Sequence, residues 1–197
     1  MHRHGIYEWL HSHWVAAALC MGLLLLVLIP VIGLPWDSFL LLIYLQTPIY
    51  MLHQVEEHTG DRFRQYVNLV VFGGIEALSP VAVLWINLPG VWLLSMLSLY
   101  AATFIGPGWG LSSVYLVTVN GITHVLAALA TRHYNPGLWT GMFLFLPAGG
   151  FTLWRTSANA SITATHHAVG LGVALAIHAA IVIYTRTRAA ALARGKG

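Results

Sequence analysis

The amino-acid sequence predicts an all-α protein, a polytopic bundle of about six to seven transmembrane helices. Of its 197 residues, 58% are hydrophobic and only 8% are charged, and the mean hydropathy is +0.74. Soluble domains carry about 25% charged residues. An exterior this poor in charge suits a lipid bilayer, whose hydrocarbon core is about 30 Å thick. The composition therefore excludes an ordinary soluble globular domain.

In lipid, a chain segment that forms an α-helix satisfies all of its own backbone hydrogen-bonding groups. Apolar stretches that lie between helix-breaking Pro and Gly residues are therefore the expected membrane spans. The stretches are residues 14–34, 38–57, 66–87, 90–106, 110–131, 137–154 and 162–185. The breakers are Pro35, Gly60, Pro89-Gly90, Gly106-Pro107-Gly108 and Asn135-Pro136-Gly137.

The sixth stretch is the weakest, because it is short and contains Pro147-Ala148-Gly149-Gly150. It is expected either to cross the bilayer or to be broken or re-entrant. With seven spans the nine Lys and Arg residues divide four against five between the two sides. With the sixth stretch not crossing they divide seven against two, which agrees better with the positive-inside rule and places both termini in the cytoplasm.

Two short segments flank the expected bundle of residues 14–185. Residues 1–13 form a His-rich segment expected to be cytoplasmic or interfacial, and residues 186–197 form a basic tail suited to anionic lipid headgroups rather than to nucleic acid. The lipid bilayer is thus the expected partner. Cys20 is the only cysteine, which excludes an intrachain disulfide and a thiolate metal cage.

The second expected span ends with the sequence His53-Gln54-Val55-Glu56-Glu57. His53 and Glu57 are four residues apart and share one helix face, so they are candidate ligands, with Glu56 as a candidate general base. The spacing is that of the inverse zinc-hydrolase motif H-x-x-E-H with Glu in place of the second His. The motif spacing favours zinc, whereas a carboxylate in place of the second histidine also suits iron or manganese. The bound ion is predicted to be zinc or iron. The alternative is that residues 53–58 are a solvated, charge-rich helix end.

Other spans carry further ionisable groups, which are costly at membrane depth and are candidates for functional sites. Glu76 is expected near the middle of the third span, and Asn120 and His124 share a face of the fifth. The last span contributes His166, His167 and His178, of which His167 and His178 lie on nearly the same face. Adjacent His166 and His167 diverge by about 100°, so they do not readily bind one ion together, and the alternative for either is a cap at the helix start. Glu76 and His167 are therefore candidate additional ligands, and an interhelical hydrogen bond is the alternative for Asn120.

Three blocks occur in a fixed order: the block at residues 53–57, Asn120-x-x-x-His124, and Arg132-x-Tyr134-x-Pro136-Gly137. The chain resembles the HXXEE-domain family of bacterial membrane proteins, whose function is undetermined, over roughly residues 40 to 185. The resemblance implies a bacterial inner membrane location. It favours a residue set that adds Arg132 and Tyr134 to the candidate catalytic residues Glu56 and Asn120.

The leading hypothesis is an intramembrane metal-dependent enzyme with His53, Glu57 and His124 as ligands, acting on a lipid-like or membrane-embedded substrate. Hydrolysis is preferred over a di-iron-type oxidation. The rival hypothesis is a small proton-coupled transporter with an intramembrane Glu/His relay. A third is a partner subunit whose buried polar groups only hold helices together.

Overall fold

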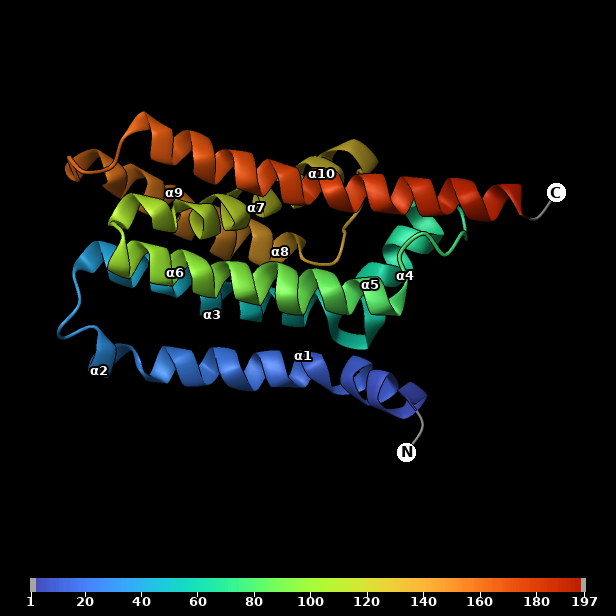
Figure 1. The fold of residues 1–197 in the computed structure, drawn as a ribbon. Coiled ribbons are helices and arrows are strands. Elements are labelled where there is room, and N and C mark those ends of the chain that lie inside the picture. Colours follow the sequence, from blue (N-terminus) through green and yellow to red (C-terminus); the bar gives the residue numbers. More distant parts are fainter. Residues whose placement is uncertain (1–2, 196–197) are drawn as a thin grey trace.

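A computed structural model describes residues 3–195, and all of the regular structure in that range is helical (Figure 1). The longer helices are α1 (Arg3–Val27), α3 (Ser38–His58), α6 (Leu94–Phe104), α7 (Leu111–Thr131), α9 (Leu146–Arg155) and α10 (Ala164–Arg194). The shorter α-helices are α2 (Ile29–Ile32), α4 (Arg62–Tyr66), α5 (Pro80–Trp85) and α8 (Leu138–Thr140). Short stretches of other helical types are η1 (Thr59–Asp61), η2 (Val67–Val71), η3 (Ile86–Leu93), η4 (Pro107–Gly110), η5 (Gly141–Phe145) and η6 (Thr156–Ala158).

The helical segments run side by side in alternating directions, and both ends of the chain lie at one end of the bundle (Figure 1). Four segments are long and apolar enough to cross a membrane: Gly5–Val27, Pro80–Phe104, Pro107–Thr131 and Ala164–Arg194. The chain is therefore an all-helical protein with the features of a membrane protein. The expected boundaries at residues 13 and 185 fall inside helices α1 and α10.

The third expected span, residues 66–87, does not form as one helix. The helical segment α4–η2 ends at Val71, and Gly73 and Gly74 follow with φ of 59° and 92°. Only glycine adopts these left-handed angles without strain, so the two glycines break the helix. Asn68 then closes the loop, because its side-chain amide donates to the Leu78 carbonyl and accepts from the Leu78 N–H. A new helix begins at Pro80.

The break expected at Pro89-Gly90 is also wrong, since residues 80–104 form one continuous helical segment. Pro89 lies inside η3, a π-helical stretch. Proline has no N–H to donate and its ring crowds the preceding turn. The wider π turn accommodates both effects, so the helix continues through the proline.

The sixth expected span is a continuous helical segment from Leu138 to Arg155, formed by α8, η5 and α9. Pro147 closely follows η5, a π-helical stretch whose wider turn accommodates the missing N–H, as at Pro89. The segment packs closely on α7, because a Cβ added at Gly121 would lie 2.9 Å from the Gly141 carbonyl oxygen. Such close backbone approach is typical of small residues at membrane helix contacts.

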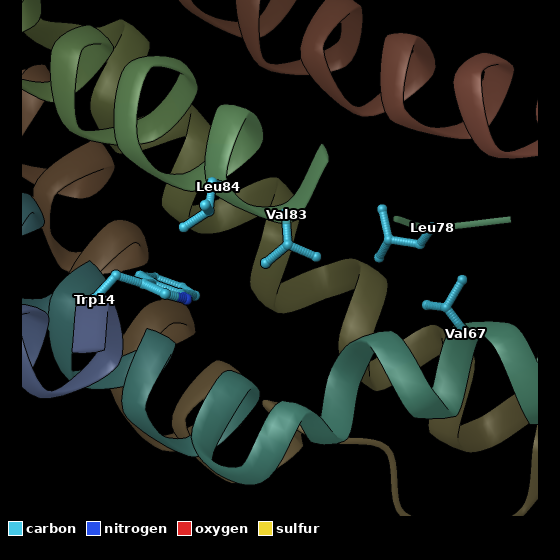
Figure 2. Close-up of a cluster of buried hydrophobic side chains, with 5 residues drawn as sticks. All are labelled: Trp14, Val67, Leu78, Val83 and Leu84. Atoms are coloured by element: carbon cyan, nitrogen blue, oxygen red, sulfur yellow. The ribbon is translucent and has the colours of Figure 1, made fainter. Parts of the chain in front are cut away.

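One apolar cluster joins α1 to the middle of the chain (Figure 2). Trp14 from α1 packs with Val83 and Leu84 of α5, while Val67 of η2 faces Leu78 across the loop. Trp14 is only 4% exposed. This contact brings α1 over the carboxyl-terminal end of α3, where the candidate ligands lie.

Candidate metal centre

Three buried side chains meet near one end of the bundle. His53 and Glu57, one turn apart on α3, face His124 of α7. The His53 Nε2 atom lies 3.5 Å from Glu57 Oε2, and the His124 Nε2 atom lies 3.5 Å from Glu57 Oε1. One ligand atom from each residue lies within 4.8 Å of the others. The three residues are 0 to 5% exposed, so this is an interior site.

The second ring nitrogen of each histidine is already bonded. His53 Nδ1 lies 2.7 Å from Thr140 Oγ1, which in turn donates to Glu56 Oε2 at 2.6 Å. The Thr140 hydroxyl proton is thus used, and the His53 Nδ1–H must be the donor. His124 Nδ1 lies 2.6 Å from Asn135 Oδ1, an acceptor whose orientation is fixed because Asn135 Nδ2 donates to the His124 carbonyl.

Both rings therefore turn the Nε2 lone pair toward Glu57. His53 Nε2 is buried and has no hydrogen-bond partner. A distance of 3.5 Å is long for a charge-assisted hydrogen bond, which measures about 2.7 to 2.9 Å. It matches the spacing of about 3.4 Å between two ligands that each lie about 2.1 Å from one ion at the tetrahedral angle. Each histidine lies 3.5 Å from a different Glu57 oxygen, and the three residues form a group that could hold a metal ion.

His58 completes the surroundings of Glu57. Its Nε2 atom lies 3.0 Å from Glu57 Oε2, and its side chain is buried rather than solvated as a charge-rich helix end would be. Trp14 covers it, with 4.8 Å between ring centroids. The solvated interpretation of this helix end is wrong for these residues, because packing of α1 removes it from solvent.

Glu56 points away from the three ligands and binds the start of α8. Its carboxylate accepts hydrogen bonds from the Tyr134 hydroxyl (2.9 Å), the Trp139 N–H (3.1 Å), and the Thr140 N–H and hydroxyl (2.7 and 2.6 Å). Helix N-termini favour such an anion because their first N–H groups lack partners. With four donors engaged, Glu56 has no free lone pair directed at the cluster, so the geometry opposes its expected role as general base.

Tyr134 and Gly137 belong to the loop that covers the cluster. Partial burial and the hydrogen bond to Glu56 raise the pKa of the Tyr134 phenol, which therefore stays a donor at neutral pH. Gly137 has φ of 97°, and a Cβ at this position would lie 2.7 Å from His53 Cε1 and 2.6 Å from His124 Cε1. Only glycine lets the backbone lie this close to both rings.

A cavity of about 300 Å³ adjoins the cluster between α7, α10 and the η2–α5–η3 region. Its polar lining includes Glu57, His124, Asn120 and His178. Asn120 donates to the Tyr50 hydroxyl at 2.5 Å. His178 Nδ1 lies 2.8 Å from the Ala174 carbonyl, so Nδ1 carries the proton and Nε2 is the free acceptor.

A second cavity, of about 480 Å³, lies between α1 and α3. Polar side chains His11, Ser12, Thr59 and Asp61 contribute to its lining. His58 and Val83 line both cavities and thus lie between them.

Three candidate residues lie away from the cluster. Glu76, expected at mid-span, lies in the loop before α5, where its half-exposed carboxylate contacts Arg64 Nη1 at 3.3 Å. His167 Nδ1 bonds the Tyr115 hydroxyl at 2.8 Å, and Tyr115 precedes His124 by nine residues, about 13 Å along the helix. Arg132 is exposed at the end of α7 with φ of 57°. His166 serves as a helix cap, accepting from the Thr163 N–H.

Sequence reasoning missed three residues that support the cluster. Asn135 was interpreted only as part of a turn, and His58 only as part of a solvated helix end; their neighbours in the three blocks were the available signal. Thr140 had no signal, because a threonine in an apolar stretch is ordinary. Its role depends on α8 placing its hydroxyl between Glu56 and His53.

The model of one protein family, described as protein of unknown function with HXXEE motif, matches residues 44–152. That range contains all three ligands, their hydrogen-bond partners Thr140 and Asn135, and Glu56. No curated protein and no solved structure matches the chain.

Proposed function

The chain belongs to the family of proteins of unknown function with an HXXEE motif, and we propose that it is a membrane-embedded, metal-dependent enzyme. Its ion is held by His53 Nε2, His124 Nε2 and a Glu57 oxygen. The single observation that carries the proposal is the orientation of the two imidazoles: each Nδ1 is bonded outward and each Nε2 faces the same buried carboxylate.

A bound cation would also offset the free-energy cost of burying the polar groups of this cluster. Burying a carboxylate is costly unless the charge is paired, and an acceptor nitrogen buried without a donor carries its own penalty. Apart from His58, the groups facing Glu57 present lone pairs when the histidines have the assigned tautomers. One bound ion satisfies the carboxylate and both nitrogens together.

The ligand set favours a site for one ion. Two histidines and one carboxylate are the ligands of mononuclear hydrolytic zinc sites, which keep a further position for water, and of mononuclear non-haem iron sites. Di-iron bundles use several more carboxylates. In residues 3–195 Glu56 is engaged by α8 and Glu76 lies in a surface loop, so the di-iron version is not supported.

We propose hydrolysis as the reaction. A bound divalent ion lowers the pKa of a coordinated water and polarises a carbonyl oxygen. The water oxygen joins the acyl carbon, the bond to the leaving group breaks, and the water proton goes to the leaving group. The chain's own residues fix the geometry: Thr140 and Asn135 hold the rings, and His58 holds Glu57.

The transporter alternative has less support. A proton relay through the bundle requires ionisable groups at successive depths. Glu56, Glu57 and His124 instead gather near one end, and Glu76 lies outside the helices at that same end. His178, the remaining candidate for the relay, lines the same cavity as Glu57 and His124.

We further propose six membrane crossings, with both termini in the cytoplasm and a bacterial inner membrane as the location. Helix α4 and the last residues of α7 and α10 lie at the end that carries both termini, whereas α9 ends at the other (Figure 1). Arg62 and Arg64 belong to α4, Arg132 follows α7, and Arg186, Arg188 and Arg194 lie near the end of α10, while Arg155 is the last residue of α9. The positive-inside rule favours the arginine-rich end as cytoplasmic. The metal centre then lies near the cytoplasmic membrane surface.

The test is elemental analysis of detergent-purified protein. Wild-type protein is expected to retain a stoichiometric transition metal, and His53→Ala, Glu57→Gln and His124→Ala are expected to lose it. His167→Ala is the matched control, because this histidine is bonded to Tyr115 far from the cluster. Metal-free wild-type protein, after metal supplementation during expression, would refute the proposal.

A further inference from the structure

The cavity beside the metal centre has apolar walls and one polar end. Apolar residues from η2, α5, η3, α7 and α10 contribute to the lining, among them Val71, Ile86, Val91, Leu116, Ile177 and Val182. Glu57, His124 and Asn120 contribute at the polar end. A site of this kind binds an apolar group and fixes its orientation with a few polar contacts.

The cavity reaches the outer surface of the bundle. Two of its lining residues, Val71 of η2 and Val182 of α10, are 56% and 50% exposed. Val182 lies within one of the segments long and apolar enough to cross a membrane. The opening between η2 and α10 therefore faces the region where lipid chains surround the helices.

The segments on either side of this opening are joined by only a few polar contacts. The Ser79 and Tyr184 hydroxyls lie 3.2 Å apart, and the Arg188 side chain donates to the Glu76 carbonyl at 2.9 Å. Both contacts link the loop before α5 to residues of α10 that lie closer to the carboxyl terminus than Val182 does. No further side-chain hydrogen bond or ion pair between α10 and that loop or η2 is found in residues 3–195.

We propose that this cavity binds the acyl chain of a membrane lipid, which enters sideways between η2 and α10 and carries its polar group to the metal centre. This inference rests on the proposed function for the reaction, but binding of the chain can be measured separately. The walls offer an acyl chain the dry, apolar surface that it has in the bilayer, and the polar end meets the carbonyl region of the lipid. Water-soluble substrates would have no such route from this side.

The test uses a phosphatidylcholine with a photoreactive diazirine in its acyl chain, incorporated into nanodiscs with the full-length protein. After illumination, peptide mapping locates the adducts. Adducts are expected at the cavity residues Ile177 and Ile181, in addition to outward-facing residues of α10 such as Leu175, which is 51% exposed. Adducts confined to outward-facing residues would overturn the proposal.

Ile177→Trp fills the cavity and is expected to abolish the Ile181 adduct. Leu175→Trp adds a tryptophan on the outward face of α10 and is expected to leave the Ile181 adduct unchanged. Ala127→Phe, on the α7 wall, replaces Ile177→Trp if that variant fails to fold. An Ile181 adduct that survives in the cavity-filling variant that folds would also refute the proposal.

Metal content measured on the same samples separates the two proposals. Inner adducts on metal-free protein would support the lipid cavity and refute the metal centre. Bound metal without adducts at Ile177 and Ile181 would support the metal centre and refute the lipid cavity.

Discussion

Replacing Thr140 by valine removes one hydroxyl that links Glu56 to His53 and keeps nearly the same side-chain shape. The Thr140 hydroxyl donates to Glu56 at 2.6 Å and accepts from His53 Nδ1 at 2.7 Å. In Thr140→Val, the His53 Nδ1–H is left buried without a partner. Glu56 keeps three of its four donors, because the Tyr134 hydroxyl and the two backbone N–H groups remain.

The expected effect is on metal affinity more than on folding. Loss of an outer partner of a metal-binding histidine lowers affinity about 10- to 100-fold, or about 1.4 to 2.7 kcal/mol. The physical reason is that His53 is then free to rotate or to adopt the other tautomer, which directs a proton at the ion. Thermal stability is expected to fall by the cost of one buried unsatisfied donor, about 1 to 3 kcal/mol.

The assay is competition for Zn²⁺ against a chromophoric chelator in detergent, with the melting temperature recorded on the same preparations. Thr152→Val is the matched control, since Thr152 is buried on α9 and accepts from Gln46 rather than from a ligand. It is expected to leave zinc affinity unchanged. Affinity in Thr140→Val within twofold of wild type, or an equal loss in Thr152→Val, would refute the assignment of the His53 tautomer.

Further predictions concern the loop, the surface carboxylate and the residue that covers Glu57. Gly137→Ala is expected to lose bound metal in elemental analysis, because the added methyl meets both histidine rings and φ of 97° disfavours alanine; retained metal would contradict this geometry. Glu76→Gln is expected to retain wild-type metal content and to change the unfolding free energy by less than about 1 kcal/mol, since its contact with Arg64 is exposed; loss of metal would restore Glu76 as a ligand. His58→Phe, which keeps the contact with Trp14 but removes the donor to Glu57, is expected to weaken zinc binding about 10-fold in the chelator assay; unchanged affinity would show that His58 only fills space.

The apolar, helical character of the chain was predictable because it depends on composition and local periodicity. The same is true of the pairing of His53 with Glu57, since residues four apart on a helix share a face wherever the helix lies. His124 was expected to join them from a separate span, and the cluster that the structure forms agrees with that expectation.

Helix boundaries were less predictable. Pro89 was expected to end a span, but a π turn carries the helix through it, whereas Gly73 and Gly74 break the segment that was expected to continue. The loop at the glycines is closed by the Asn68 side chain, which bonds the Leu78 backbone ten residues along the chain, and apolar spacing does not show this contact.

The sequence by itself determined a helical membrane protein with a polar face on the helix at residues 38–58, because hydrophobic burial and helical periodicity act over neighbouring residues. The tertiary structure alone decided what each polar side chain on that helix faces. Adjacent Glu56 and Glu57 diverge by about 100° around the axis, so one carboxylate meets the start of α8 and the other meets His124. That division depends on where α7 and α8 pack, and it separates the residue that positions His53 from the residue proposed to hold the ion.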